Sequence, residues 1–120
     1  MIRKARLTDA KQIQGLINSF AKKDLMLARS LNEIYENIRD FFVFTNAKEI
    51  IGTVALHISW EDLGEIKALA VNERFQGKGV GLKLVKRAMA EAKTLKLNRI
   101  FTLTYIPQFF KKFGCQFYEL

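Results

Sequence analysis

The sequence contains one cysteine, one proline and no long apolar run. A single cysteine cannot form an internal disulfide, which favours the reducing cytoplasm as the location. With 49% hydrophobic and 27% charged residues, the composition is that of a folded chain and not of a disordered one. No apolar stretch approaches the roughly 20 residues that span a membrane, and residues 1–4 lack the apolar core of a signal peptide. We therefore expect no membrane partner, and the length suggests a single domain over residues 1–120.

Negative charge is also scarce, since 12 acidic residues face 20 basic ones and the formal net charge is +8. An excess of this sign suits nucleic acid, a cofactor with several phosphate groups or an acidic substrate. The basic residues are scattered and form no dedicated arm, so we do not expect nucleic acid as a partner. The chain has one histidine and no cluster of metal-binding side chains, so we expect no metal.

Glycine is sparse except in one stretch, where three of the seven glycines occupy positions 77, 79 and 81. The apolar run of residues 66–71 precedes this stretch and a helical pattern from Leu82 follows it. A glycine-rich turn that opens a helix directs several free N–H groups, and the positive end of the helix dipole, at one point. The stretch therefore predicts a phosphate-binding loop. A P-loop would need Ser or Thr in place of Gly79, and a dinucleotide fingerprint would need glycine in place of Leu82, so neither motif is present.

Predicted strands and helices make up most of the remaining chain, in the order β, α, α, β, β, β, loop, α, β, α, β. Apolar periodicity predicts strands over residues 2–7, 41–45, 50–60, 65–71, 98–104 and 116–120. It predicts helices over residues 9–20, 30–38, 82–92 and 107–113. Gly52 is expected to mark a bulge, and Gly114 is expected to end the last helix.

Two capping boxes are predicted at the starts of the first two helices. Thr8 or Asp9 is placed to cap the first helix, and Gln12 could close a capping box on Asp9. Ser30 and Glu33 have the spacing of a second box. These signals predict a helix that begins near residue 9 and another that begins directly after residue 30.

The motif Gln76-x-x-Gly79-x-Gly81 resembles the pyrophosphate loop of the GNAT acetyltransferases, written Q/R-x-x-G-x-G/A. The order of the predicted elements along residues 2–120 is also that of the GNAT fold. The resemblance implies a mixed α/β (α+β) class, with a central, mostly antiparallel twisted sheet flanked by helices. It implies that the family's last strand is missing after Leu120, unless a partner chain completes the sheet in a homodimer.

The resemblance also implies acetyl-CoA as the cofactor, used as a co-substrate. In the family, the loop amides hold the pyrophosphate, and main-chain N–H groups at the end of the fourth strand contact the acetyl oxygen and the pantetheine arm. Phe110 stands in Phe109-Phe110-Lys111-Lys112-Phe113-Gly114, which resembles Phe-Tyr-x-x-x-Gly-Phe of the family. The implied cofactor-binding residues are Leu69, Ala70, Val71, Gln76, Gly77, Lys78, Gly79, Val80, Gly81 and Phe110.

Acetyl transfer needs a base for the amine and, where the leaving thiolate is protonated, an acid. Gly64-Glu65-Ile66 looks like the Ala-Glu-Ile of family members that use this glutamate as the base. His57, Glu61 and Asp62 are alternative bases. Phenylalanine at position 110 cannot donate a proton, so Tyr105 at the end of the preceding strand is the predicted acid.

Three segments are similar to short bacterial amino-acid N-acetyltransferases of the N-acetylglutamate synthase type: residues 23–41, 55–66 and 103–110. The resemblance implies direct transfer of an acetyl group to L-glutamate in a ternary complex, which is the first step of arginine biosynthesis. We expect the amine substrate to contact Arg29, Ser30, His57 and Lys67. The alternatives are another amine, such as a protein N-terminus, a polyamine or a small molecule, and a non-catalytic CoA-binding sensor.

Overall fold

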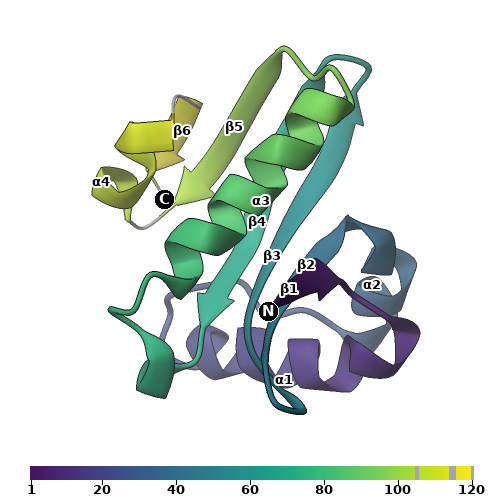
Figure 1. The fold of residues 1–120 in the computed structure, drawn as a ribbon, viewed down its shortest axis with the longest axis vertical. Helices are drawn as coiled ribbons and strands as arrows, with labels where there is room; N and C mark the ends of the chain where they lie inside the picture. Colours follow the sequence, from purple (N-terminus) through teal and green to yellow (C-terminus); the bar gives the residue numbers. More distant parts are fainter. Residues whose placement is uncertain (105, 114–115, 120) are drawn as a thin grey trace.

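A computed structural model describes residues 1–104, 106–113 and 116–119 (Figure 1). The strands are β1 (Ile2–Lys4), β2 (Phe41–Asn46), β3 (Glu49–Trp60), β4 (Leu63–Val71), β5 (Arg99–Thr104) and β6 (Gln116–Glu119). The helices are α1 (Ala10–Ala21), α2 (Leu31–Glu36), α3 (Val80–Thr94) and α4 (Pro107–Phe110). Short 3-10 turns are η1 (Leu7–Asp9), η2 (Ile38–Asp40), η3 (Glu73–Phe75) and η4 (Lys111–Phe113). The predicted helix end at Gly114 lies outside the described residues.

The strands form one six-stranded sheet in the order β1-β2-β3-β4-β5-β6. Neighbours from β1 to β4 pair antiparallel, whereas β4 pairs with β5 and β5 with β6 in parallel. The parallel step from β4 to β5 requires a crossover, and α3 supplies it. The prediction of a mixed, mostly antiparallel sheet flanked by helices is confirmed.

Helices cover both faces of the sheet, with α3 on one face and α1 and α2 on the other (Figure 1). On the α3 face, Leu84 and Val85 are fully buried beside Ile66 of β4. On the other face, Ile13 and Ile17 of α1 are fully buried in a second cluster. Burying each of these side chains contributes about 1.5–3 kcal/mol, so the apolar stripes hold both layers on the sheet.

Gly52 allows α3 to approach the sheet closely. The register between β2 and β3 shifts there, because Phe44 pairs with Gly52 but Thr45 pairs with Ile50. A Cβ atom at Gly52 would lie 2.9 Å from the Leu84 side chain and 3.1 Å from that of Val80. The predicted bulge is confirmed. Because Gly52 has no side chain, Val80 and Leu84 of α3 can pack directly against β3.

The N-terminal segment differs from the prediction, since β1 ends at Lys4 and Asp9 does not cap α1 with its side chain. The Asp9 carboxylate accepts hydrogen bonds from the Arg3 guanidinium at 2.7 and 3.1 Å, and from the Arg6 N–H at 2.7 Å. Gln12 instead accepts from the Ile50 N–H at 3.2 Å. The predicted Asp9–Gln12 box is therefore wrong, because the Arg3 guanidinium and the Arg6 N–H bind the Asp9 carboxylate instead.

The second capping box is confirmed. The Glu33 N–H donates to the Ser30 hydroxyl oxygen at 3.1 Å, and the Ser30 N–H donates to the Glu33 carboxylate at 3.3 Å. Ser30 therefore fixes the start of α2.

The Arg3–Asp9 pair should make the free energy of unfolding depend on pH. The hydrogen bond from Arg3 holds the pKa of the Asp9 carboxyl below its usual range, against the opposing effect of burial. Such a carboxyl adds stability above its unfolded-state pKa and loses it as the pH falls through the lower folded-state pKa. We expect Asp9→Asn to lower the free energy of unfolding by about 2 kcal/mol at neutral pH, and by progressively less below about pH 4. Urea unfolding at a series of pH values measures this difference.

Asp24→Asn is the matched control, because Asp24 is exposed and its backbone φ of 57° suits asparagine. It should change stability little at any pH. A difference between wild type and Asp9→Asn that does not vary with pH would contradict the assigned role of the Asp9 charge.

Candidate functional site

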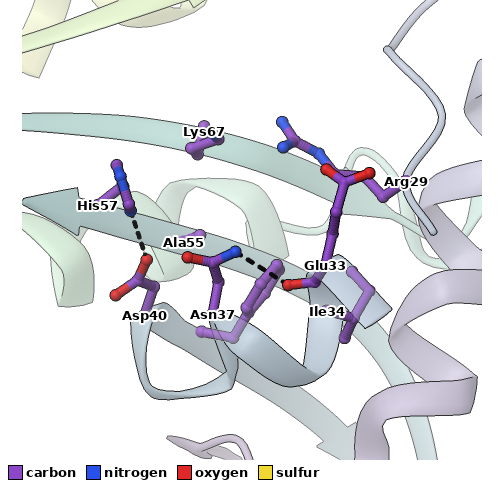
Figure 2. A pocket seen from close by; sticks show the side chains of 9 residues that line it. Arg29, Glu33, Ile34, Asn37, Asp40, Ala55, His57 and Lys67 are labelled. Atoms are coloured by element: carbon purple, nitrogen blue, oxygen red, sulfur yellow. Dashed lines mark hydrogen bonds and ion pairs between the residues drawn. The ribbon is translucent and has the colours of Figure 1, made fainter. Parts of the chain in front are cut away.

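A hollow beside α2 gathers basic side chains on the α1–α2 face of the sheet (Figure 2). Its volume is about 290 Å³, part of it open to solvent. We call it the α2 hollow, and its lining residues are Arg29, Glu33, Ile34, Asn37, Asp40, Phe41, Ala55, His57 and Lys67. The structure thus brings together three of the predicted substrate residues. The fourth, Ser30, does not line the hollow and caps α2 instead.

The main chain of Arg29 is held by two polar side chains of α1. The Asn18 side-chain oxygen accepts from the Arg29 N–H at 3.0 Å, and its amide nitrogen donates to the Arg29 carbonyl at 3.3 Å. Gln14, one turn earlier, donates to the same carbonyl at 3.2 Å. These bonds position the segment from which the guanidinium enters the hollow. Sequence reasoning missed both residues, although their spacing of four along the helix places them on one side of α1.

The guanidinium of Arg29 carries an unused hydrogen-bond donor. Its Nε atom is buried and has no partner among the described residues. Leaving a buried donor unsatisfied costs about 1–3 kcal/mol, more for a charged group. A carboxylate bound in the hollow would satisfy this donor, because arginine presents its N–H groups in a fork that matches a carboxylate.

Three titratable side chains lie together where β3 runs beside β4. His57 of β3 is the register partner of Glu65 of β4, and Lys67 follows two residues later. The Glu65 carboxylate lies 4.0 Å from the Lys67 ammonium. The His57 Nδ1 atom lies 2.7 Å from a carboxylate oxygen of Asp40, which sequence reasoning missed. Glu65, the predicted base, does not line the α2 hollow but is the strand neighbour of residues that do.

An extra residue interrupts β4 just beyond Lys67. Ala55 pairs with Lys67 and Thr53 pairs with Ala70. Between these two pairs β4 therefore contains one residue more than β3. Ala68 has a φ of 55°, in a region that residues other than glycine seldom occupy. Ala68 consequently packs on the α1–α2 face, whereas Leu69 packs on the α3 face. This β-bulge changes which face of the sheet the side chains after Lys67 point to.

β4 and β5 separate beyond the same point. Their pairing ends at Ile66 and Thr102, and the Thr102 hydroxyl donates to the Ile66 carbonyl at 2.7 Å. Among the described residues, β5 offers no pairing partner to the later part of β4, which includes Leu69, Ala70 and Val71. Main-chain N–H groups on this edge are therefore available for a ligand.

The glycine loop, residues 76–81, leads from η3 into α3. Gly77 and Gly79 have φ values of 77° and 84°, and a Cβ atom at either would meet nothing within 4 Å. Gly79 is the N-cap of α3 and provides no side chain to cap its first N–H groups. Gln76 steadies the loop by donating from its side chain to the Val71 carbonyl at 2.9 Å. The loop thus leaves the N-terminus of α3 open, and phosphate binding there stays a prediction.

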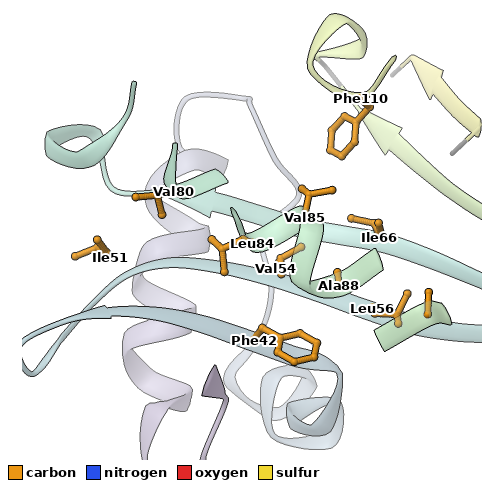
Figure 3. Packing of buried hydrophobic residues seen from close by; sticks show 11 residues of the cluster. Phe42, Ile51, Val54, Leu56, Ile66, Val80, Leu84, Val85, Ala88 and Phe110 are labelled. Carbon is orange, nitrogen blue, oxygen red and sulfur yellow. The ribbon is translucent and has the colours of Figure 1, made fainter. Parts of the chain in front are cut away.

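Phe110 was predicted to bind the cofactor and Tyr105 to act as the acid. Phe110 is 3% exposed and packs with the α3-face cluster (Figure 3). Its ring lies 5.1 Å from that of Phe109, centroid to centroid. Tyr105, the predicted acid, lies outside the described residues.

Within residues 1–104, 106–113 and 116–119, no group of three or more His, Cys, Asp or Glu side chains could hold a metal ion. In the same part of the chain, no helix combines the length and the apolar character needed to cross a membrane.

Comparisons with known proteins identify relatives of this chain. A profile of the acetyltransferase (GNAT) family matches residues 8–115. The amino-acid acetyltransferase of Mycobacterium tuberculosis is 35% identical over 95% of this chain and 67% of the relative. An uncharacterized N-acetyltransferase of Chlorobaculum tepidum is 41% identical over 94% of this chain and 73% of the relative.

Two solved structures are also similar. Rv2747 of Mycobacterium tuberculosis, in complex with CoA, has a TM-score of 0.89 at 35% identity, over 95% of this chain and 70% of that one. N-acetylglutamate synthase from Neisseria gonorrhoeae, complexed with coenzyme A and N-acetyl-glutamate, has a TM-score of 0.89 at 28% identity. The match covers 95% of this chain but 27% of the synthase.

Gly79→Val should weaken CoA binding. A β-branched residue at a positive φ costs about 1–2 kcal/mol, so the loop is expected to leave the conformation that presents its amides. We expect the Kd for CoA to rise at least about tenfold, measured by isothermal titration calorimetry. Gly15→Ala is the control, because its Cβ would meet nothing within 4 Å and it lies in α1, away from the loop. It should leave the Kd unchanged, and unchanged binding by Gly79→Val would contradict the role of the loop.

Proposed function

The chain belongs to the acetyltransferase (GNAT) family, and from that premise we propose that it transfers the acetyl group of acetyl-CoA to the amino group of an amino acid, L-glutamate being the best candidate. The coarser activity, acetyl-CoA-dependent N-acetyl transfer, follows from the family and from relatives named as amino-acid acetyltransferases. The identity of the acceptor is the proposal. We also propose that this reaction is the first step of arginine biosynthesis and that the protein is located in the cytoplasm.

The observation that carries the proposal is the unpaired Nε donor of Arg29 in the α2 hollow. This donor is buried and has no partner within the part of the chain that the structure describes, and the Lys67 side chain lines the same hollow. Glutamate has two carboxylates, so one could pair with each cation. The related synthase of Neisseria gonorrhoeae was solved with N-acetyl-glutamate, the product that this acceptor would give.

The bulge in β4 explains how donor and acceptor could meet. Lys67 lines the α2 hollow, and Leu69, one residue beyond Ala68, packs on the α3 face beside the free edge of β4. Acetyl-CoA would lie along that edge, with its pyrophosphate at the glycine loop. An amino acid held in the hollow would then approach the thioester from the other side of the same strand. This arrangement supports direct transfer in a ternary complex.

In the proposed reaction, main-chain groups stabilise charge and side chains transfer protons. The free N–H groups of β4 would stabilise the negative charge that develops on the acetyl oxygen as the amine attacks. Glu65 would accept the proton that the ammonium group must lose, directly or through a water. Tyr105 is proposed to protonate the departing thiolate, since the buried Phe110 ring has no proton to give.

Phe110 also supports a second candidate function. A phenylalanine at this position would suit a CoA-binding module without turnover. That module would bind acetyl-CoA and release no free thiol with any amine.

Free-thiol release from acetyl-CoA, measured with the twenty amino acids and several polyamines, tests the proposal. We expect release with L-glutamate, or with glutamate and its close relatives. Release with other amines only would overturn the assignment of the acceptor and retain the family activity. Binding of acetyl-CoA without release on any amine would favour the CoA-binding module.

Removing the side chain that positions Arg29 should raise the KM for the acceptor. Asn18→Ala deletes two of the three side-chain hydrogen bonds to the Arg29 main chain and leaves the one from Gln14, so the guanidinium should be held less well in the hollow. We expect the KM for glutamate to rise about tenfold, with kcat and the KM for acetyl-CoA nearly unchanged, because ground-state and transition-state binding weaken together.

Asn32→Ala is the matched control for this prediction. The Asn32 side chain is exposed and bonds to Glu36 at 2.7 Å, and it does not line the hollow. Its steady-state constants should equal those of the wild type. An Asn18→Ala enzyme with unchanged KM for glutamate would contradict the positioning role.

A further inference from the structure

The only histidine of the chain forms a pair with Asp40 at the edge of the α2 hollow (Figure 2). The two residues are 17 positions apart, and the Nδ1 atom of His57 lies 2.7 Å from the Asp40 carboxylate. The His57 side chain is 41% exposed and that of Asp40 is 23% exposed. One end of the ring is therefore anchored while the other remains accessible to solvent.

The partner of Nδ1 determines what the other ring nitrogen can do. An ionised carboxylate only accepts hydrogen bonds, so the proton of the neutral imidazole resides on Nδ1. Nε2 then carries the lone pair and can accept a proton. Asp40 can continue to accept from Nδ1 in the imidazolium, so the ring need not turn when it becomes charged.

His57 also lies beside the proposed base. His57 and Glu65 are register partners in the antiparallel pair of β3 and β4, so their side chains share one face. Directly opposed residues have Cβ atoms about 4.5–5.5 Å apart, within the reach of a carboxylate and an imidazole. The Glu65 side chain is 16% exposed, less than half the value for His57. His57 is thus the more exposed of two titratable side chains that are cross-strand neighbours.

We propose that His57, positioned by Asp40, carries the proton of the acceptor amine from Glu65 to solvent, an inference that rests on the proposed function. The ammonium group of the substrate gives one proton to the Glu65 carboxylate. The resulting carboxylic acid passes that proton to Nε2 of His57, which becomes imidazolium and regenerates the Glu65 carboxylate. The imidazolium then releases the proton to bulk water, and no group is oxidised or reduced.

Charged groups from every neighbouring element surround this path. Asp40 belongs to η2, Glu33 to α2 and Lys67 to β4, whereas Arg29 precedes α2. The Lys67 ammonium lies 4.0 Å from the Glu65 carboxylate, where the path begins. The path therefore joins the proposed base, Glu65, to a more exposed side chain that lines the α2 hollow.

Buffer dependence of turnover tests the relay. In dilute non-imidazole buffer we expect His57→Ala to lower kcat at least about tenfold, because the main route for the proton is lost. Added imidazole should restore kcat in a saturable manner, whereas an equal concentration of a non-basic salt should not. The wild type should respond to neither. If kcat of His57→Ala is lowered but does not respond to imidazole, the relay is wrong and His57 has only a structural role.

Asp40→Asn tests the positioning role separately. The chain has a single histidine, so selective ¹⁵N labelling gives one pair of ring signals. At alkaline pH the wild type should carry its proton on Nδ1, and Asp40→Asn should move a measurable share of it to Nε2 while lowering kcat. An unchanged tautomer would contradict the inference. Failure of the proposed function is distinct, since it would show as no thiol release by the wild type with any amine.

Discussion

One extra residue in β4 is the constraint on which the site depends. In a regular strand Leu69 would face the same side as Lys67, two residues earlier. The bulge at Ala68 instead directs Lys67 towards the α2 hollow and Leu69 towards α3. The positive φ of Ala68 costs about 1 kcal/mol, which the packing of Leu69 and Val71 against the α3 cluster offsets. Where the bulge begins, pairing with β5 has already ended, so the main chain is free for a ligand.

The proposed function gives the positive charge of the chain two different partners, one on each face of the sheet. On one side, a helix N-terminus and a glycine loop with positive φ values suit the phosphates of CoA. On the other side, Arg29 and Lys67 suit the carboxylates of an amino acid. A net charge of +8 spread without a basic arm is consistent with this division. The two binding regions meet only at β4, where acetyl transfer would take place.

Local patterns predicted much of the fold, because periodicity and caps act over a few residues. The buried Ile13 and Ile17 stripe, the Ser30–Glu33 box and the glycine loop were all accessible from the sequence. The polar pairs between separate elements were not. Asp9 bonds to Arg3, six positions earlier, and the Asn18 side chain bonds to main-chain atoms of Arg29, which every residue type has. The His57–Asp40 pair and the bulge at an alanine likewise depend on how segments meet, and alanine does not signal a positive φ.

Amide NMR of the ¹⁵N-labelled chain tests the central claim, that two ligands bind on opposite sides of β4, most directly. CoA should shift the amide signals of Leu69, Val71, Gly79 and Gly81, and glutamate should shift those of Arg29 and Lys67, each ligand leaving the other set nearly unchanged. Both sets should move when the two ligands are added together. Glutamate that shifts the glycine loop, or that competes with CoA for the same amides, would contradict the account.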